Sequence, residues 1–87
     1  MIITFPDQSN MNSETFGINF PAIVDGERVI CVLSTEALQD INPQARGDST
    51  NQQFEANRAA FEAIAERLIR DGKVVNGRVF IGSEHVR

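Results

Sequence analysis

Apolar and polar residues alternate on both sides of Asp25-Gly26 in the manner of two paired β-strands. The Asp-Gly pair is typical of a two-residue type I′ turn, in which both central residues take positive φ angles. This turn places Val24 opposite Glu27, and side chains then alternate between the two faces of the hairpin. One face is apolar throughout and consists of Ile18, Phe20, Ala22, Val29, Cys31 and Leu33. We therefore expect a hairpin over residues 18–33 with this face in the core.

The other face of the predicted hairpin is mixed, because it also carries Asn19 and Arg28. Its apolar positions are Pro21, Ile23, Ile30 and Val32. One long helix covers only one face of a sheet, and a small monomer rarely exposes an apolar patch without a use for it. We therefore expect these four residues to form an interaction surface, in a homodimer or for an unidentified protein partner. A short helix after the hairpin could instead fold over this face.

Pro21 constrains the edge of the strand that contains it. Proline has no backbone N–H, so this strand needs an open edge at Pro21. The apolar N-terminal residues can pair with the strand before that point, which places Ile3 opposite Ile18. Phe5 then lies opposite Phe16, and both pairs add to the core face.

A short helix is predicted directly after the hairpin, over residues 35–41. Ser34 or Thr35 is a good N-cap, and Glu36 in the first turn interacts favourably with the helix dipole. The polar residues that follow Cys31 are therefore interpreted as capping groups and not as partners of a reactive thiol.

A long helix is predicted after a polar loop. Ser49 and Gln52 match a capping box, and Thr50 and Gln53 match it as well. Gly72 is typical of the residue that follows a last helical turn. Positions i, i+7, i+10 and i+14 form one apolar stripe, which consists of Phe54, Phe61, Ile64 and Leu68. The stripe predicts one continuous helix that packs against the sheet.

Asn57 is the polar exception on this stripe. Either its amide bonds to a nearby loop carbonyl, or it marks a polar spot in a pocket that binds a small ligand. Buried polar groups are normally satisfied locally, which favours the first interpretation.

A second turn signal, Asn76-Gly77, precedes a last apolar strand over residues 79–81. With the hairpin and the helices, the pattern predicts a single small α+β domain over residues 1–87. Its fold is an antiparallel sheet of about four strands, with one long helix packed on one face and a short helix after strand three. Residues 83–87 either add one capped turn or fray.

Charge and composition narrow the function. The net charge is −4 and the eight basic residues are scattered, whereas nucleic-acid binders usually cluster Lys and Arg. The longest apolar run, residues 29–33, is too short to cross a membrane. One cysteine cannot form an intrachain disulfide, and no targeting segment is visible, so we expect a cytoplasmic location. We therefore expect no nucleic acid and no membrane among the partners.

Cys31 and His85 are the only cysteine and histidine of the chain. One residue of each type, so far apart, does not make a structural zinc site, so we expect no metal and no cofactor. Catalysis would require an exposed Cys31 beside an ordered His85, whereas the strand pattern buries Cys31 opposite Phe20. The sequence therefore disfavours an enzyme.

Several short segments carry a resemblance that covers most of the chain in order. They are ITFPD at residues 3–7, FPAIVDG at 20–26, Cys31, STEAL at 34–38, FEANR at 54–58 and EAIAERLI at 62–69. With these segments the sequence resembles a small bacterial family catalogued as domain of unknown function 1488. The resemblance implies a compact α+β domain and supplies no catalytic or binding residues.

Two classes of function remain. The sequence favours a non-enzymatic protein-interaction or adaptor domain that uses the surface around Ile30. The alternative is a small-ligand-binding or regulatory domain with a pocket near Asn57. A concave pocket with converging polar groups would favour the alternative.

Overall fold

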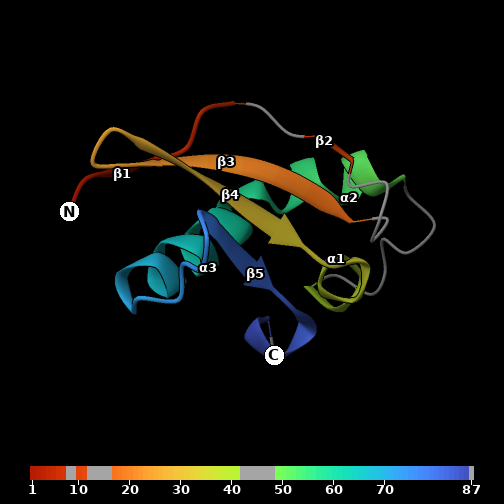
Figure 1. The fold of residues 1–87 in the computed structure, drawn as a ribbon. Coiled ribbons are helices and arrows are strands. Elements are labelled where there is room, and N and C mark those ends of the chain that lie inside the picture. The colour runs from red at the N-terminus through yellow and green to blue at the C-terminus, as the bar shows by residue number, and fades with distance from the viewer. Residues whose placement is uncertain (8–9, 12–16, 42–48, 87) are drawn as a thin grey trace.

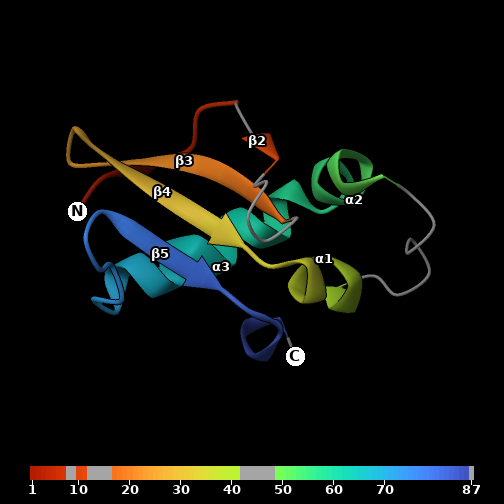
Figure 2. The ribbon, with the colours of Figure 1, turned by 45° about the vertical axis from the view of Figure 1, so that its right-hand side comes forward.

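The computed structural model describes residues 1–7, 10–11, 17–41 and 49–86. Its elements, in chain order, are β1 (Ile3–Thr4), β2 (Asn10–Met11), β3 (Ile18–Val24), β4 (Glu27–Leu33), α1 (Thr35–Ile41), α2 (Thr50–Ala56), α3 (Arg58–Arg70), β5 (Arg78–Ile81) and the 3₁₀ turn η2 (Ser83–His85). A twisted sheet forms one layer, α2 and α3 lie on one side of it, and α1 lies at its end (Figures 1 and 2). Among the described residues, no helix is both long and apolar enough to span a membrane. The predicted α+β class is confirmed.

The hairpin of β3 and β4 has the predicted geometry. Asp25 and Gly26 take φ angles of 50° and 87°, as a type I′ turn requires. The register is the predicted one, with Phe20 opposite Cys31. Every residue of the predicted core face of this hairpin is buried.

The sheet is mixed, whereas the sequence predicts a wholly antiparallel one. The strand order is β1-β3-β4-β5, and β2 also pairs with β3. β5 runs parallel to β4, with Val79 opposite Cys31. The reason is the crossover through α1, α2 and α3, which returns the chain to the end of the sheet at which β4 begins. The second predicted turn is also present, since Asn76 and Gly77 take φ angles of 53° and 74°.

The predicted register of the first strand is wrong. Ile3 lies opposite Val24, at the far end of β3, and not opposite Ile18. Asp25 accounts for this position, because its Oδ1 accepts a hydrogen bond of 2.8 Å from the Ile2 N–H. The Asp25 N–H also donates to the Ile2 carbonyl oxygen at 2.9 Å. The turn residue therefore holds the N-terminal strand beside the hairpin tip.

Among the described residues, the outer edge of β3 is paired at both ends and has no partner strand between them. β1 reaches Ile23, and β2 pairs with β3 at Asn19. Pro21 lies in the gap between these two short strands, so the prediction of an open edge at Pro21 is confirmed. The other predicted pair, Phe5 with Phe16, involves a residue outside the described part of the chain.

The predicted helix starts are confirmed. The Ser34 Oγ accepts a hydrogen bond of 3.1 Å from the Ala37 N–H, so α1 begins at Thr35. Ser49 and Gln52 form the capping box of α2. In this box the Gln52 N–H lies 3.2 Å from the Ser49 Oγ, and the Ser49 N–H lies 3.0 Å from the Gln52 Oε1.

The sequence predicts one continuous long helix, whereas the structure has α2 and α3 with a break at Asn57. This residue has φ −124° and ψ 18°, which are not helical values. The end of α3 is the predicted one. The Gly72 N–H donates to the Ile69 carbonyl at 3.1 Å, and the Lys73 N–H donates to the Leu68 carbonyl at 3.0 Å. These two bonds form a Schellman motif.

Aromatic rings form the centre of the core. The ring centroids of Phe5 and Phe20 are 6.2 Å apart, and those of Phe20 and Phe54 are 5.1 Å apart. Phe61 continues the series at 6.0 Å from Phe54. Such separations are favourable for aromatic pairs. The series joins the segment after β1 to β3, α2 and α3, and it lies on one face of the sheet only.

Gly17→Ala should destabilise the fold more than Gly26→Ala. A Cβ at Gly17 would overlap the carbonyl oxygen of Leu33, so the backbone must shift, and we expect a loss of at least ~2 kcal/mol. The space around Gly26 is open, and the positive φ alone costs Gly26→Ala roughly 1 kcal/mol. Urea unfolding of both variants measures the difference. Equal losses would show that the backbone at Gly17 does not approach Leu33 so closely.

Candidate interaction face

The side of the sheet turned away from α2 and α3 carries the alternate side chains of β3, β4 and β5. They are Asn19, Pro21, Ile23, Arg28, Ile30, Val32, Arg78 and Phe80. We call this group the open face. Neither α2 nor α3 lies on this side (Figure 2). The four residues predicted as an interaction surface all belong to it.

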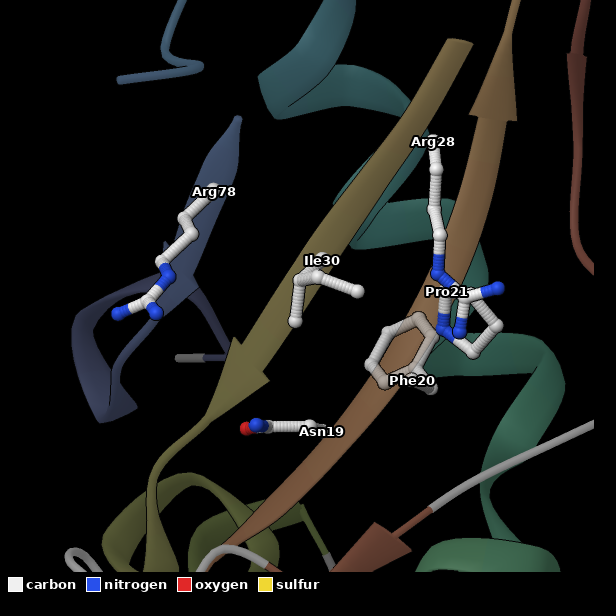
Figure 3. Close-up of a pocket in the computed structure, with 6 residues that line it drawn as sticks. All are labelled: Asn19, Phe20, Pro21, Arg28, Ile30 and Arg78. Atoms are coloured by element: carbon white, nitrogen blue, oxygen red, sulfur yellow. The ribbon is translucent and has the colours of Figure 1, made fainter. Parts of the chain in front are cut away.

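The apolar side chains of the open face differ in exposure. Phe80 is 59% exposed, Ile23 and Ile30 are half-buried, and Val32 is 7% exposed. Pro21 is also buried, and the side chain of Arg28 extends toward it in Figure 3, where both line one hollow. The apolar surface therefore centres on Ile30 and Phe80. Its use as an interaction surface stays a prediction.

A hollow of about 170 Å³ lies at the end of the open face where β4 and β5 begin. Its lining residues are Asn19, Phe20, Pro21, Arg28, Ile30 and Arg78. Arg28 and Arg78 lie on opposite sides of Ile30 (Figure 3). Within the described part of the chain, neither guanidinium forms an ion pair. We call this the basic hollow, since it combines two positive charges with an apolar floor.

A second hollow, of about 160 Å³, lies at the other end of the open face. Val32, Ser34, Phe80, Ile81, Gly82 and Glu84 line it. The side chain of Glu84 is 73% exposed, and its Oε1 lies 3.7 Å from the Nδ1 of His85. This Nδ1 also accepts a hydrogen bond of 3.0 Å from the Gly82 N–H. We call this the acidic hollow.

The outer edge of β5 is closed at both ends. The Val75 N–H donates a hydrogen bond of 2.8 Å to the Arg78 carbonyl, and the Arg78 N–H donates one of 3.0 Å to the Val75 carbonyl. The Gly82 N–H donates a hydrogen bond of 3.0 Å to the His85 Nδ1, and the His85 N–H donates one of 3.0 Å to the Gly82 carbonyl. Alternate residues of β5 bond to β4, so among the described residues only Phe80 turns an unpaired N–H and C=O outward. This edge is a poor template for an added strand, which leaves the open face as the better binding surface.

Asn57 has a local role. It is half-buried, and its Nδ2 donates a hydrogen bond of 3.0 Å to the Gln53 carbonyl. The amide is therefore satisfied by the backbone of α2, and not by a loop carbonyl as we expect from sequence. Neither the basic hollow nor the acidic hollow includes Asn57. A ligand pocket near Asn57 stays a prediction that these two hollows do not support.

Arg58 is the centre of an ion-pair network beside this break in the helix. Its NH2 nitrogen lies 2.7 Å from Glu55 and 3.4 Å from Asp7, and its NH1 lies 3.6 Å from Glu62. Its guanidinium also lies 4.7 Å from the centre of the Phe54 ring. The hydrogen bond from Arg58 lowers the pKa of Glu55. The network joins the start of α3 to α2 and to the segment after β1, which indicates a structural role.

Cys31 is buried in the core, and burial raises the pKa of its thiol from 9.0 to about 12, with a further contribution from Glu62. The thiol is therefore protonated at neutral pH, and a protonated thiol is a weak nucleophile. No three His, Cys, Asp or Glu residues come together as metal ligands among the residues described. The open face is thus the feature with the most evident capacity to bind.

The sequence does not predict the position of Arg78 on the open face or of Glu84 in the acidic hollow. Arg78 and Phe80 alternate with the buried Val79 and Ile81, which is the signal for a strand with two faces. Alternation shows that Arg78 and Phe80 share one face of β5. It does not show that this face is continuous with that of Ile30, which follows only from the pairing of β5 with β4. Glu84 lies beyond the strand, so no periodicity places it.

Two comparisons place the chain among known proteins. A family model described as "Protein of unknown function (DUF1488)" matches residues 3–81. The crystal structure of a protein of unknown function from the same family, from Shewanella loihica PV-4, is similar with a TM-score of 0.72. The two chains are 24% identical, and the alignment covers 91% of this chain and 90% of that one. At this identity the similarity concerns the fold. No protein of curated function matches the chain.

The free energy of unfolding should fall as the pH rises from about 9 to about 12. The unfolded chain loses the Cys31 proton near pH 9, whereas the folded chain keeps it until its higher pKa, so alkaline pH favours unfolding. The expected slope approaches about 1.4 kcal/mol per pH unit. Lys73 is the only lysine and tyrosine is absent, so few other groups titrate in this range.

Urea unfolding of the wild type and Cys31→Ala across this pH range measures the effect. The variant should lose ~1–2 kcal/mol at neutral pH through the cavity that it creates, and it should lack the alkaline slope. The same slope in both proteins would show that the thiol titrates normally in the folded state.

Proposed function

The chain belongs to the DUF1488 family of proteins of unknown function, and from that premise we propose that it is a non-enzymatic protein-interaction or adaptor domain of the bacterial cytoplasm. One observation carries the proposal. The open face presents a half-buried Ile30 and a 59% exposed Phe80 on the side of the sheet opposite to α2 and α3. A protein partner that covers this face would remove apolar surface from water.

The composition of the open face supports a protein partner. Its exposed members include Arg28, Arg78 and Phe80, and arginine and aromatic residues are enriched at the energetic centres of protein interfaces. The basic and acidic hollows lie at its two ends and can each accept a side chain. The closed edge of β5 also favours binding on the face over binding by strand addition.

The size of the hollows supports a protein partner over a small ligand. Sites for small ligands usually have volumes of roughly 300–1,000 Å³ and enclose most of the ligand. The basic hollow has about 170 Å³ and the acidic hollow about 160 Å³. Hollows of this size suit single side chains of a partner better than a whole ligand. The buried, protonated Cys31 adds support for a role without catalysis.

Affinity capture with two matched variants tests the proposal. Ile30→Glu places a charge at the centre of the open face, and Ala63→Glu adds the same charge on the exposed surface of α3. The wild type and Ala63→Glu, immobilised and exposed to a lysate of the native host, should retain the same proteins. Ile30→Glu should retain them at least tenfold less, as measured by quantitative mass spectrometry.

Circular dichroism should first establish that Ile30→Glu is folded. A wild type that retains nothing beyond the bare support would contradict an interaction domain. So would an Ile30→Glu variant that retains the same proteins in the same amounts, because binding would then use another surface.

A further inference from the structure

The charges of the open face are arranged along its strands. Arg28 and Arg78 lie at the end where β4 and β5 begin, and Glu84 lies beyond the end of β5. Val32 and Phe80 are paired neighbours between these ends. The open face is therefore basic at one end, apolar in the middle and acidic at the other end.

We propose that the partner of the open face is a second copy of the same chain, packed face to face with its strands antiparallel to those of the first. This inference rests on the proposed function, because it takes the open face as the binding surface. To the proposed function it adds the identity of the partner and the orientation of the partner's strands relative to those of this chain.

Two-fold symmetry makes the charge arrangement self-complementary. In a closed dimer both copies use the same surface, so a contact from one residue to a second is repeated in reverse. When two faces pack together, the axis lies in the plane of contact. An axis that crosses the strands near Phe80 reverses the strand direction. It sets Arg78 of each copy against Glu84 of the other, with the two Phe80 rings between them.

The other orientation is unfavourable. A two-fold axis parallel to the strands places the basic end of one copy against the basic end of the other. Arg28 and Arg78 of one copy then lie close to Arg28 and Arg78 of the second. Like charges placed against each other in an interface disfavour that arrangement. The charges therefore select the antiparallel orientation.

The exposure of the contact residues fits this arrangement. Phe80 is 59% exposed and the Glu84 side chain is 73% exposed, so both are accessible to a second copy. Within the described part of the chain, Arg78 forms no ion pair, and Glu84 forms none with a lysine or an arginine. A second copy supplies the opposite charge for each of them. The two Phe80 rings would also form an aromatic pair.

The net charge opposes association but acts over a longer range. Each copy carries −4, so two copies repel each other at a distance. At physiological salt this repulsion is screened beyond roughly 8 Å, whereas charges in direct contact interact over about 4 Å. The local Arg–Glu contacts therefore determine the orientation, and we expect a reversible dimer.

A charge-swap cycle tests the proposal by sedimentation equilibrium. The proteins are the wild type, Arg78→Glu, Glu84→Arg and the double variant. We expect a wild-type dimer. Each single variant should raise its dissociation constant at least tenfold, because symmetry places two like-charge contacts in the interface. The double variant should return to within a few-fold of the wild type, since it restores both contacts with reversed sign.

Arg70→Glu, the same charge reversal on α3 away from the open face, is the control and should leave the dissociation constant unchanged within a few-fold. Recovery in the double variant is the decisive result, because a structural role of either residue would not produce it. A double variant as weak as the single variants would overturn the proposal, and so would a wild type that is monomeric at about 1 mM.

The outcomes distinguish this inference from the proposed function. A monomeric wild type whose capture of other proteins is lost in Ile30→Glu would overturn the second copy and retain the interaction domain. A dimer that Ile30→Glu disrupts and the charge reversals do not affect would overturn the antiparallel orientation. A dimer that Ile30→Glu leaves intact would overturn this inference, because self-association would then use another surface, and the capture experiment would still decide the proposed function.

Discussion

The type I′ turn at Asp25-Gly26 is the constraint on which the rest of the structure depends. Side chains alternate along a strand with a period of two, so a slip of one residue would exchange the two faces of the hairpin. The turn excludes that slip, and it thereby places Phe20 in the core and Ile30 on the opposite side. Asp25 has a second role, because its carboxylate holds Ile2 and positions β1. One turn therefore determines the core, the open face and the place of the N-terminal strand.

The features that sequence predicts well are local ones. The hairpin register follows from two adjacent turn residues, and the helix starts follow from side chains that bond within three positions, such as Ser49 and Gln52. The features that sequence misses depend on distant contacts. As an apolar residue, Ile3 fits opposite either end of β3, and the two hydrogen bonds between Ile2 and Asp25 hold it at the end beside the turn. The break at Asn57 lies beside the Arg58 network, which no helical periodicity reveals.

The candidate site follows the same division. Alternation along β3 and β4 assigns Pro21, Ile23, Ile30 and Val32 to one face, and the structure agrees with that assignment. Alternation does not show that Pro21 and Val32 are buried, because burial depends on the surrounding side chains and strands and not on the face alone. The charge pattern of the face depends on β5, whose parallel pairing results from a crossover through three helices. An exposed face with opposite charges at its two ends is thus a product of topology.

That crossover also has a consequence for biosynthesis. β5 leaves the ribosome after the other described strands, yet it pairs with the central strand β4 along Ile30–Leu33. Between Leu33 and Arg78 the chain must grow by 45 residues, which takes roughly 2–9 s at about 5–20 residues per second. During that interval the nascent hairpin presents an apolar, hydrogen-bonding edge with no strand to occupy it. Until β5 arrives, this edge of β4 is the part of the chain most open to non-native strand pairing, whereas the finished fold makes the edge of β5 a poor template for further strands.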